Sequence, residues 1–287
     1  MISKMKIWMR DLQSGARTTT AGIPHIQEKI NNLNKEMVAL RKDLQKIALG
    51  TPAPQTGTAA LHAPQEQPDS RKHRVVLKVD KEQWSGTAQP GELSFHRTST
   101  FRADHEKFTA ANARFFDGFG FSATQFTGKT IVDLGAGSKL RALYFTGANI
   151  IAIEPLAEKF MQEIEWCDLR KASEVYSAPA EAMIDGLAGR VDFLFSINVL
   201  DHCYDFVDCI ANIYAYLKPG GTAFLAFDCH QKTDDLHPII VNEKVASAAM
   251  FDAGFQIDKL ERIASFHRGI AAYAIALYLT KPKGDQV

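Results

Sequence analysis

Three patterns of hydrophobic and polar positions follow one another along this chain of 287 residues. From Ile23 to Ile47 the apolar residues are spaced alternately three and four apart, as at positions a and d of heptad repeats. So narrow a stripe predicts a coiled-coil helix over residues 23–49; the alternative is a single amphipathic helix packed on its own domain. Residues 50–72 contain four prolines among small and polar residues. They predict a disordered linker, because they cannot bury enough apolar surface to become ordered.

The third pattern begins at residue 73 and alternates short apolar runs with longer segments of helical periodicity. A strand that is apolar throughout is buried on both faces, as in a parallel sheet covered by helices. The pattern therefore predicts a doubly wound, mostly parallel α/β sheet over residues 73–287, with the last two strands forming a hairpin at its edge. The predicted strands are 131–134, 150–153, 193–196, 222–227, 255–263 and 271–280, with helices over 205–217 and 241–253.

Composition narrows the classes of function. The chain has 33 basic and 33 acidic residues, whereas a dedicated nucleic-acid binder usually has a basic excess. Residues 1–50 nevertheless carry a net charge of +5, which leaves −5 for the rest. Within the N-terminal segment 1–22, a membrane-surface contact of residues 1–13 is the weaker alternative to a frayed terminus. The four cysteines form no CxxC pair and no zinc-like spacing, so we expect reduced thiols, no metal site and a cytoplasmic protein.

The candidate chemistry lies where the first predicted strand ends, in Asp133-Leu134-Gly135-Ala136-Gly137. Two glycines separated by one residue allow a sharp turn and the close approach of a ligand to the backbone. The next strand ends in Glu154, which could accept both hydroxyls of an adenosine ribose. A nicotinamide-binding unit would need glycine or alanine at residue 140, where this chain has leucine, and this counts against a dinucleotide.

From about residue 96 to 263 the chain resembles the class I S-adenosylmethionine-dependent methyltransferases. Five segments match this family in order: the glycine-rich segment at 133–137, the acidic residue at 154, the adenine-facing segment at 177–182, the fourth-strand motif at 195–205 and the Leu-Lys-Pro-Gly-Gly loop at 217–221. The sequence departs from the family at Lys139, where a third glycine is common. Phe95–Arg102 is also similar to a helix of the ubiquinone-pathway O-methyltransferases whose arginine meets the cofactor's carboxylate.

The resemblance implies a seven-stranded Rossmann-like domain that binds S-adenosyl-L-methionine. The cofactor-binding residues that it implies are Arg102, Asp133, Gly135, Ala136, Gly137, Glu154, Pro155, Ala180, Glu181, Ser196 and Asn198. A sulfonium methyl is already electrophilic, so transfer needs mainly proximity and orientation.

An oxygen nucleophile would benefit from a base, for which histidine is the natural choice. His202 follows the fourth strand and is the predicted catalytic base; the alternative is a residue that only shapes the pocket. His230 and His237 are candidates for the pocket rim, and Asp201 and Asp205 are expected to cap helices.

The sequence thus predicts a methyltransferase that acts on a small-molecule or glycan acceptor, with a hydroxyl as the methylated group. The coiled coil would make it a homo-oligomer, and no nucleic-acid partner is expected. The alternatives are a protein or tRNA methyltransferase, and an inactive scaffold that only binds the cofactor.

Overall fold

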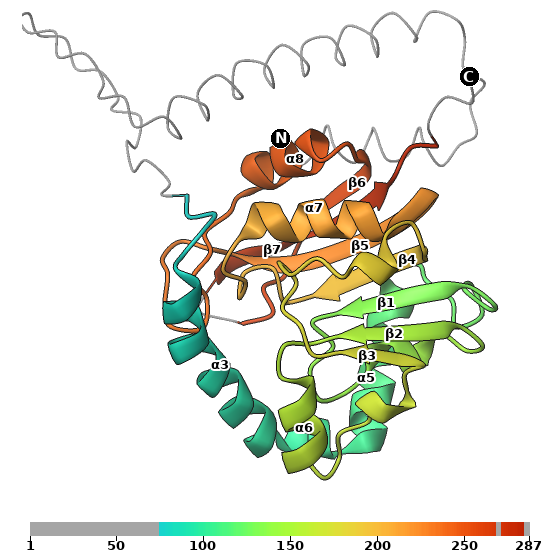
Figure 1. The fold of residues 1–287 in the computed structure, drawn as a ribbon, viewed down its shortest axis with the longest axis vertical. Coiled ribbons are helices and arrows are strands. Elements are labelled where there is room, and N and C mark those ends of the chain that lie inside the picture. The colour runs from blue at the N-terminus through green and yellow to red at the C-terminus, as the bar shows by residue number, and fades with distance from the viewer. Residues whose placement is uncertain (1–74, 268–270, 284–287) are drawn as a thin grey trace, which may run out of the picture. The chain divides into compact units, whose positions relative to one another are not determined.

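The domain is built on a seven-stranded sheet, which confirms the predicted doubly wound α/β fold (Figure 1). The computed structural model describes residues 75–267 and 271–283. The order across the sheet is β3-β2-β1-β4-β5-β7-β6; the first five are parallel, and β7 runs antiparallel to both neighbours. The strands are β1 Thr130–Leu134, β2 Asn149–Ile153, β3 Glu174–Tyr176, β4 Val191–Ile197, β5 Leu217–His230, β6 Gln256–Ile263 and β7 Ala271–Thr280.

Helices cover both faces of the sheet, as the apolar strands require. Alternate residues of β1 pack into two different cores, Ile131 into one and Val132 into the other. The core with Ile131 includes residues of α5 (His105–Gly118) and α6 (Ala157–Glu163); the other includes residues of α7 (Phe206–Tyr216) and α8 (Glu243–Asp252). The remaining short elements are α4 Thr100–Ala103 and the 3₁₀ turns η1 Arg141–Tyr144, η2 Leu169–Lys171 and η3 Asp185–Leu187.

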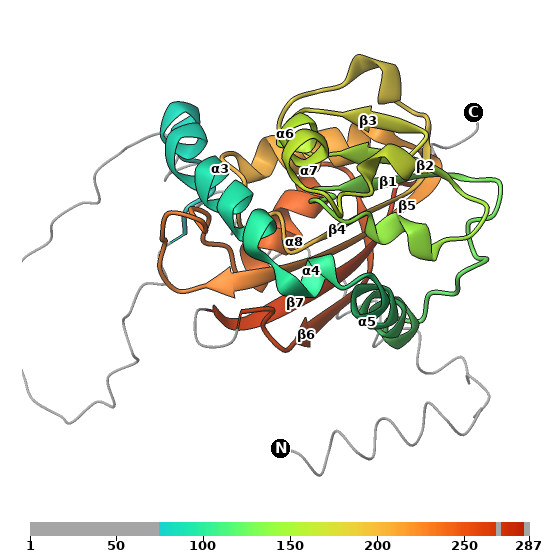
Figure 2. The same cartoon turned by 90° about the horizontal axis from the view of Figure 1, so that it is seen from below.

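Helix α3 (Lys81–Thr98) runs past the carboxyl ends of the central strands (Figures 1 and 2). It contains Gly86, Pro90 and Gly91, all poor helix formers. Its start is fixed by Asp80, whose carboxylate accepts a hydrogen bond from the Gln83 N–H at 2.9 Å. Packing requires glycine at position 91, because a Cβ there would lie 2.5 Å from the Leu236 side chain. Tertiary packing therefore holds a helix that local propensity does not favour.

The Lys-Pro-Gly-Gly segment, predicted as a loop, lies inside the range of β5. Val191 of β4 pairs with Leu217, but Phe193 pairs with Thr222, so residues 218–221 interrupt the ladder. Gly220 has a φ of 80°, a conformation that favours glycine. The loop is thus an irregularity within a longer strand. The predicted edge hairpin of β6 and β7 is confirmed.

The two predicted helix-capping aspartates have different outcomes. Asp205 caps α7, because its carboxylate accepts the N–H groups of Val207 and Asp208, both at 3.1 Å. The prediction for Asp201 was wrong: this fully buried residue lies 2.8 Å from His230 Nε2.

The predicted segments 1–22, 23–49 and 50–72, together with the predicted domain boundary at 73, lie outside the described residues. Among the described helices, none combines the length and apolar character that crossing a membrane requires.

Candidate active site

The loop after β1 has room for glycine alone at two positions. Gly135 and Gly137 have φ angles of 72° and 64°. A Cβ at Gly135 would lie 2.3 Å from the Val199 side chain, and one at Gly137 would lie 2.6 Å from His96 Cε1. Both contacts are shorter than packed atoms allow, so the GxG spacing is a requirement of this fold.

Glu154, just past the end of β2, is tied to this loop. One carboxylate oxygen accepts the Gly137 N–H at 2.9 Å, and the other accepts the Leu156 N–H at 3.0 Å. Each oxygen keeps a free lone pair, so the carboxylate can still accept two hydroxyl groups. Burial raises the pKa of Glu154 to about 7, although these two hydrogen bonds lower it.

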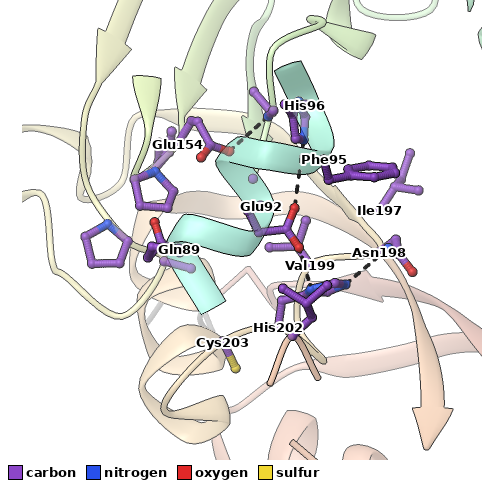
Figure 3. A pocket seen from close by; sticks show the side chains of 18 of the residues that line it. Gln89, Glu92, Phe95, His96, Glu154, Ile197, Asn198, Val199, His202 and Cys203 are labelled. Atoms are coloured by element: carbon purple, nitrogen blue, oxygen red, sulfur yellow. Dashed lines mark hydrogen bonds and ion pairs between the residues drawn. The ribbon is translucent and has the colours of Figure 1, made fainter. Parts of the chain in front are cut away.

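A cavity of about 460 Å³ joins this loop to the end of β4 and to α3, and Figure 3 shows part of its wall. The volume lies within the range of small-molecule sites. Ten of the twelve predicted site residues line it: Arg102, Gly135, Ala136, Gly137, Glu154, Pro155, Ala180, Glu181, Asn198 and His202.

Asp133 and Ser196 do not line the cavity, so the structure does not support their predicted contact with the cofactor. The Asp133 carboxylate accepts the Ala142 N–H at 3.0 Å, and its burial raises its pKa to about 7. It therefore fixes η1. Ser196 is buried within β4, with its hydroxyl unpartnered among the described residues. Sequence alone does not distinguish these buried positions from those that face the cavity.

Lys139, which stands where a third glycine is common, is buried and pairs with Asp168. The Nζ–Oδ2 distance is 3.3 Å, and the other Asp168 oxygen accepts the Leu140 N–H at 2.6 Å. The Asp168 carboxylate therefore balances the positive charge of Lys139.

Two arginines line the cavity without a carboxylate within ion-pair distance among the described residues: Arg102 and Arg141. Burial, assisted by Arg141, lowers the pKa of Arg102 to about 10. Burial also lowers the pKa of Arg141. Two desolvated guanidinium groups in a cavity favour an anionic ligand group, such as a carboxylate. Arg141 was missed from the sequence because it lies beyond the glycine-rich motif.

The opposite end of the cavity is formed by the turn after β4 and by α3 (Figure 3). His202 Nδ1 lies 3.0 Å from Glu92 Oε1, and its Nε2 lies 3.3 Å from the Asn198 amide nitrogen and 3.7 Å from Asp201 Oδ2. Trp84 Nε1 donates to the His202 carbonyl at 2.7 Å. Burial lowers the pKa of His202, but Asp201 and Glu92 more than offset this and raise it to about 9.

Glu92 was missed from the sequence, because its segment showed no helical stripe. His237 and His267 also line this end, while His230 lies behind it against Asp201. Of the two histidines predicted at the rim, the structure therefore places His237 on the cavity wall and His230 outside it.

The chain has similarity to known proteins. Residues 132–225 match the protein family described as a methyltransferase domain. The ubiquinone biosynthesis O-methyltransferase of Nitrobacter winogradskyi is 26% identical over 172 residues, which are 59% of this chain and 64% of the relative. The one from Pseudomonas paraeruginosa is 29% identical over 105 residues, 34% of this chain and 44% of the relative. The chain thus matches less than two thirds of the length of these relatives.

A solved structure with similarity is the 1,6-didemethyltoxoflavin-N1-methyltransferase of Burkholderia thailandensis with bound S-adenosylhomocysteine. It is 14% identical, with a TM-score of 0.47, and the match covers 78% of this chain and 94% of that one.

The matched segment contains the glycine loop and its acidic partner within the doubly wound sheet. Residues 132–225 are thus a methyltransferase domain by their family match, and the cofactor that this match indicates is S-adenosylmethionine. The residues of the cavity fit S-adenosylmethionine. Glu154 has free lone pairs that can accept the ribose hydroxyls, and the glycines let a ligand approach the backbone. The two cavity arginines can bind the carboxylate of the cofactor.

The raised pKa of Glu154 predicts that cofactor affinity depends on pH. Ribose hydroxyls donate to the carboxylate form, so binding should strengthen as pH rises through about 7. If only the ionised form binds, affinity for S-adenosylhomocysteine should increase roughly 10-fold between pH 6 and pH 8. Calorimetry at several pH values measures this. The variant Glu154→Gln should show a flat profile, and an equally steep profile in that variant would contradict the assignment.

Proposed function

We propose that this domain transfers the methyl group of S-adenosylmethionine to an oxygen of a small-molecule or glycan acceptor. The observation that carries the proposal is the division of the cavity into two ends. The glycine loop and Glu154 lie on one side, His202 lies on the other, and Glu92 of α3 lies between them (Figure 3). The two arginines and two further histidines complete the lining. The similarity to ubiquinone biosynthesis O-methyltransferases supports oxygen as the acceptor atom.

At the cofactor end, Glu154 would hold the ribose, and Arg102 with Arg141 would bind the carboxylate. When bound, the cofactor supplies a methyl group on a positively charged sulfur, which becomes a neutral thioether once the methyl is on the acceptor oxygen. The residues of this end therefore provide orientation.

At the acceptor end, His202 in its neutral form would accept the proton of the acceptor hydroxyl, because a protonated hydroxyl attacks poorly. Since the pKa of His202 is raised to about 9, the rate should increase as the pH rises toward 9. The turn after β4 fixes the histidine, with Glu92 and Asp201 on its two ring nitrogens. Helix α3 covers this end and contributes Trp84, Glu92 and Phe95 to the wall, which limits the access of water.

A screen with isotopically labelled S-adenosylmethionine tests the proposal. The acceptors are phenols, catechols and sugars, with matched aliphatic and aromatic amines for comparison. We expect a labelled methyl ether together with S-adenosylhomocysteine. Methylation of amines alone would contradict the proposed acceptor, and cofactor binding without any turnover would favour an inactive scaffold.

We also propose that residues 23–49 associate as a coiled coil and make the protein a homo-oligomer. The support is the heptad spacing of the apolar residues in this segment. Deleting residues 1–50 should lower the stoichiometry measured by light scattering while leaving the affinity for S-adenosylhomocysteine unchanged, since the predicted linker separates the two parts. A truncated chain that keeps the full-length stoichiometry would contradict this.

A further inference from the structure

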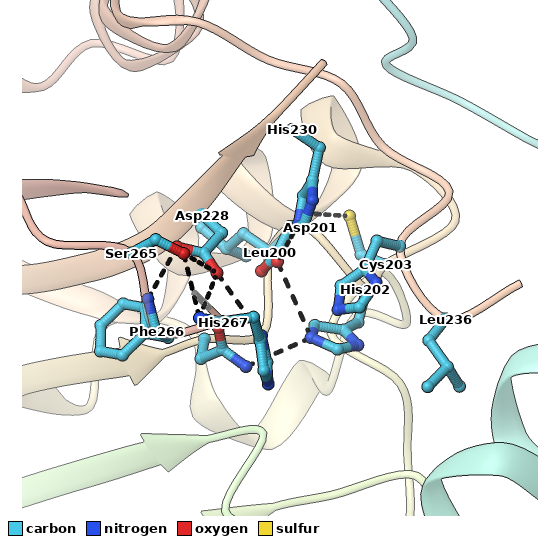
Figure 4. Close-up of polar contacts among 12 residues, drawn as sticks. Leu200, Asp201, His202, Cys203, Asp228, His230, Leu236, Ser265, Phe266 and His267 are labelled. Carbon is cyan, nitrogen blue, oxygen red and sulfur yellow. Dashed lines mark hydrogen bonds and ion pairs between the residues drawn. The ribbon is translucent and has the colours of Figure 1, made fainter. Parts of the chain in front are cut away.

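Behind and beside the acceptor end lies a cluster of histidines and aspartates that contact one another: His202, His230, His237, His267, Asp201, Asp228 and Asp234. The ring centroids of His202 and His237 are 4.5 Å apart, and those of His230 and His237 are 4.4 Å apart. Figure 4 shows Asp201 between His202 and His230, with His267 beside Asp228. This arrangement goes beyond what methyl transfer from a sulfonium requires.

Two histidines of this cluster are each oriented by a carboxylate on one ring nitrogen. His202 Nδ1 faces Glu92 Oε1 at 3.0 Å, and His237 Nδ1 faces Asp234 Oδ1 at 2.8 Å. A carboxylate hydrogen-bonded to Nδ1 fixes the tautomer that leaves Nε2 without a proton, as on His237, whose Nε2 lone pair is available. This is the usual second shell of a histidine that binds a metal ion. On His202 the Nε2 atom faces the Asn198 amide nitrogen at 3.3 Å, so a metal ion would replace this contact.

Side-chain atoms of Asp201 and His237 in this cluster are buried and have no hydrogen-bond partner among the described residues. His237 is 4% exposed and its Nε2 has no hydrogen-bond partner; Asp201 is fully buried and its Oδ1 has none. One ligand atom from each of Asp201, His202 and His237 can be chosen so that all three lie within 4.8 Å of one another. Buried polar atoms without partners are costly, and both Asp201 and His237 carry one within this group of three residues. The combination points to a ligand at this place.

The charge of the cluster favours a cation. Within the described residues, every ion-pair partner of Asp201, Asp228 and Asp234 is a histidine. A histidine that binds a metal ion is neutral, so metal binding would displace the proton that the raised pKa of His202 indicates. The carboxylates of the cluster would then balance the charge of a divalent ion.

The geometry points to a divalent transition-metal ion bound by Asp201, His202 and His237 at the acceptor end of the cavity. Two imidazoles and a carboxylate suit Zn²⁺, Fe²⁺ or Mn²⁺, whereas Mg²⁺ prefers oxygen ligands alone. His202 and His237 both line the cavity, so the open coordination positions of the ion would face the acceptor.

This inference deepens the proposed function and rests on it for the identity of the ligand in the open position, an acceptor oxygen. A metal ion acting as a Lewis acid lowers the pKa of an oxygen that it binds. His202 would then promote ionisation of the hydroxyl as a ligand of the ion.

The test is direct metal binding by the untagged full-length chain. After chelation and dialysis, the protein is titrated with Zn²⁺ and with Mn²⁺ in competition with a chromophoric chelator, and bound metal is counted by mass spectrometry. We expect one tightly bound equivalent, with affinity at least ~100-fold lower in His237→Ala and ~10–100-fold lower in Glu92→Ala, which removes only the orienting carboxylate. His105→Ala, at an exposed histidine on α5, should leave the affinity unchanged.

Circular dichroism and the affinity for S-adenosylhomocysteine verify that each variant is folded. Asp201→Asn is the second ligand variant, and it should also lose the tight equivalent. Absence of a tight equivalent in the wild type, or the same affinity in His237→Ala and Asp201→Asn, would overturn the inference.

The metal site and the proposed function can fail separately. A tight equivalent that the ligand variants lose supports the metal site even if no hydroxyl is methylated. Undiminished methyl transfer by chelated protein without metal overturns the metal site and leaves the proposed function standing.

Discussion

Replacing His202 with alanine is expected to slow the single-turnover methylation of a hydroxyl acceptor at least ~100-fold. The reason is its position: it lines the acceptor end of the cavity, next to the turn after β4 and in contact with Glu92 at 3.0 Å. A group that promotes ionisation of the acceptor typically contributes ~10²–10⁴-fold in rate. Rapid-quench measurement with saturating cofactor isolates this step from binding and product release.

Cofactor affinity distinguishes a role in the reaction from a role in the fold. In His202→Ala the affinity for S-adenosylhomocysteine should stay within about twofold of wild type, because Glu154 and the glycine loop lie at the other end of the cavity. His105→Ala is the control for histidine removal at an exposed position. A His202→Ala enzyme within a few-fold of the wild-type rate would make this residue part of the pocket wall only.

The second large effect is expected for Glu154→Ala. This change removes a charged acceptor for the ribose hydroxyls and should cost ~1.5–3 kcal/mol of binding free energy. The affinity for S-adenosylhomocysteine would then fall roughly 10- to 150-fold. Isothermal titration calorimetry measures it directly.

A matched control lies four residues further along the chain. Glu158→Ala removes an exposed carboxylate at the start of α6 and should leave the affinity unchanged. Because Glu154 also accepts the Gly137 and Leu156 N–H groups, thermal melting must show that the variant remains folded. Unchanged affinity in a folded Glu154→Ala protein would refute the ribose assignment.

The central strands could be predicted from the sequence because they are short runs of mostly apolar residues. Runs such as 131–134 and 150–153 have one interpretation, a strand buried on both faces, and both are strands of the structure. β3 was missed, since its three residues, Glu174 to Tyr176, are only half-buried and carry no such signal.

The glycine loop and Glu154 could be predicted because their chemistry is local. Positive φ angles require the glycines, and the end of the neighbouring strand places the carboxylate beside them. The acceptor end is different, because its groups come from distant segments. Glu92 lies on a helix that contains Pro90 and two glycines, and tertiary packing of its buried side chains, such as Trp84 and Leu93, holds that helix in place.

The contact between Asp201 and His230 could not be predicted from the sequence either, because the fold creates it. A carboxylate shortly before a helix is an ordinary cap, and only the parallel pairing of β4 with β5 brings His230 within 2.8 Å of it. The histidine cluster therefore arises from tertiary structure, from residues that have no motif in common along the chain.

The orientation of the cofactor in the cavity is the central claim of this account. A crystal structure of the full-length chain with S-adenosylhomocysteine tests it most directly. We expect the ribose hydroxyls on the Glu154 carboxylate, the amino-acid carboxylate beside Arg102 and Arg141, and the sulfur facing His202. A ligand whose ribose lies away from Glu154, or whose sulfur faces away from His202, would contradict the account.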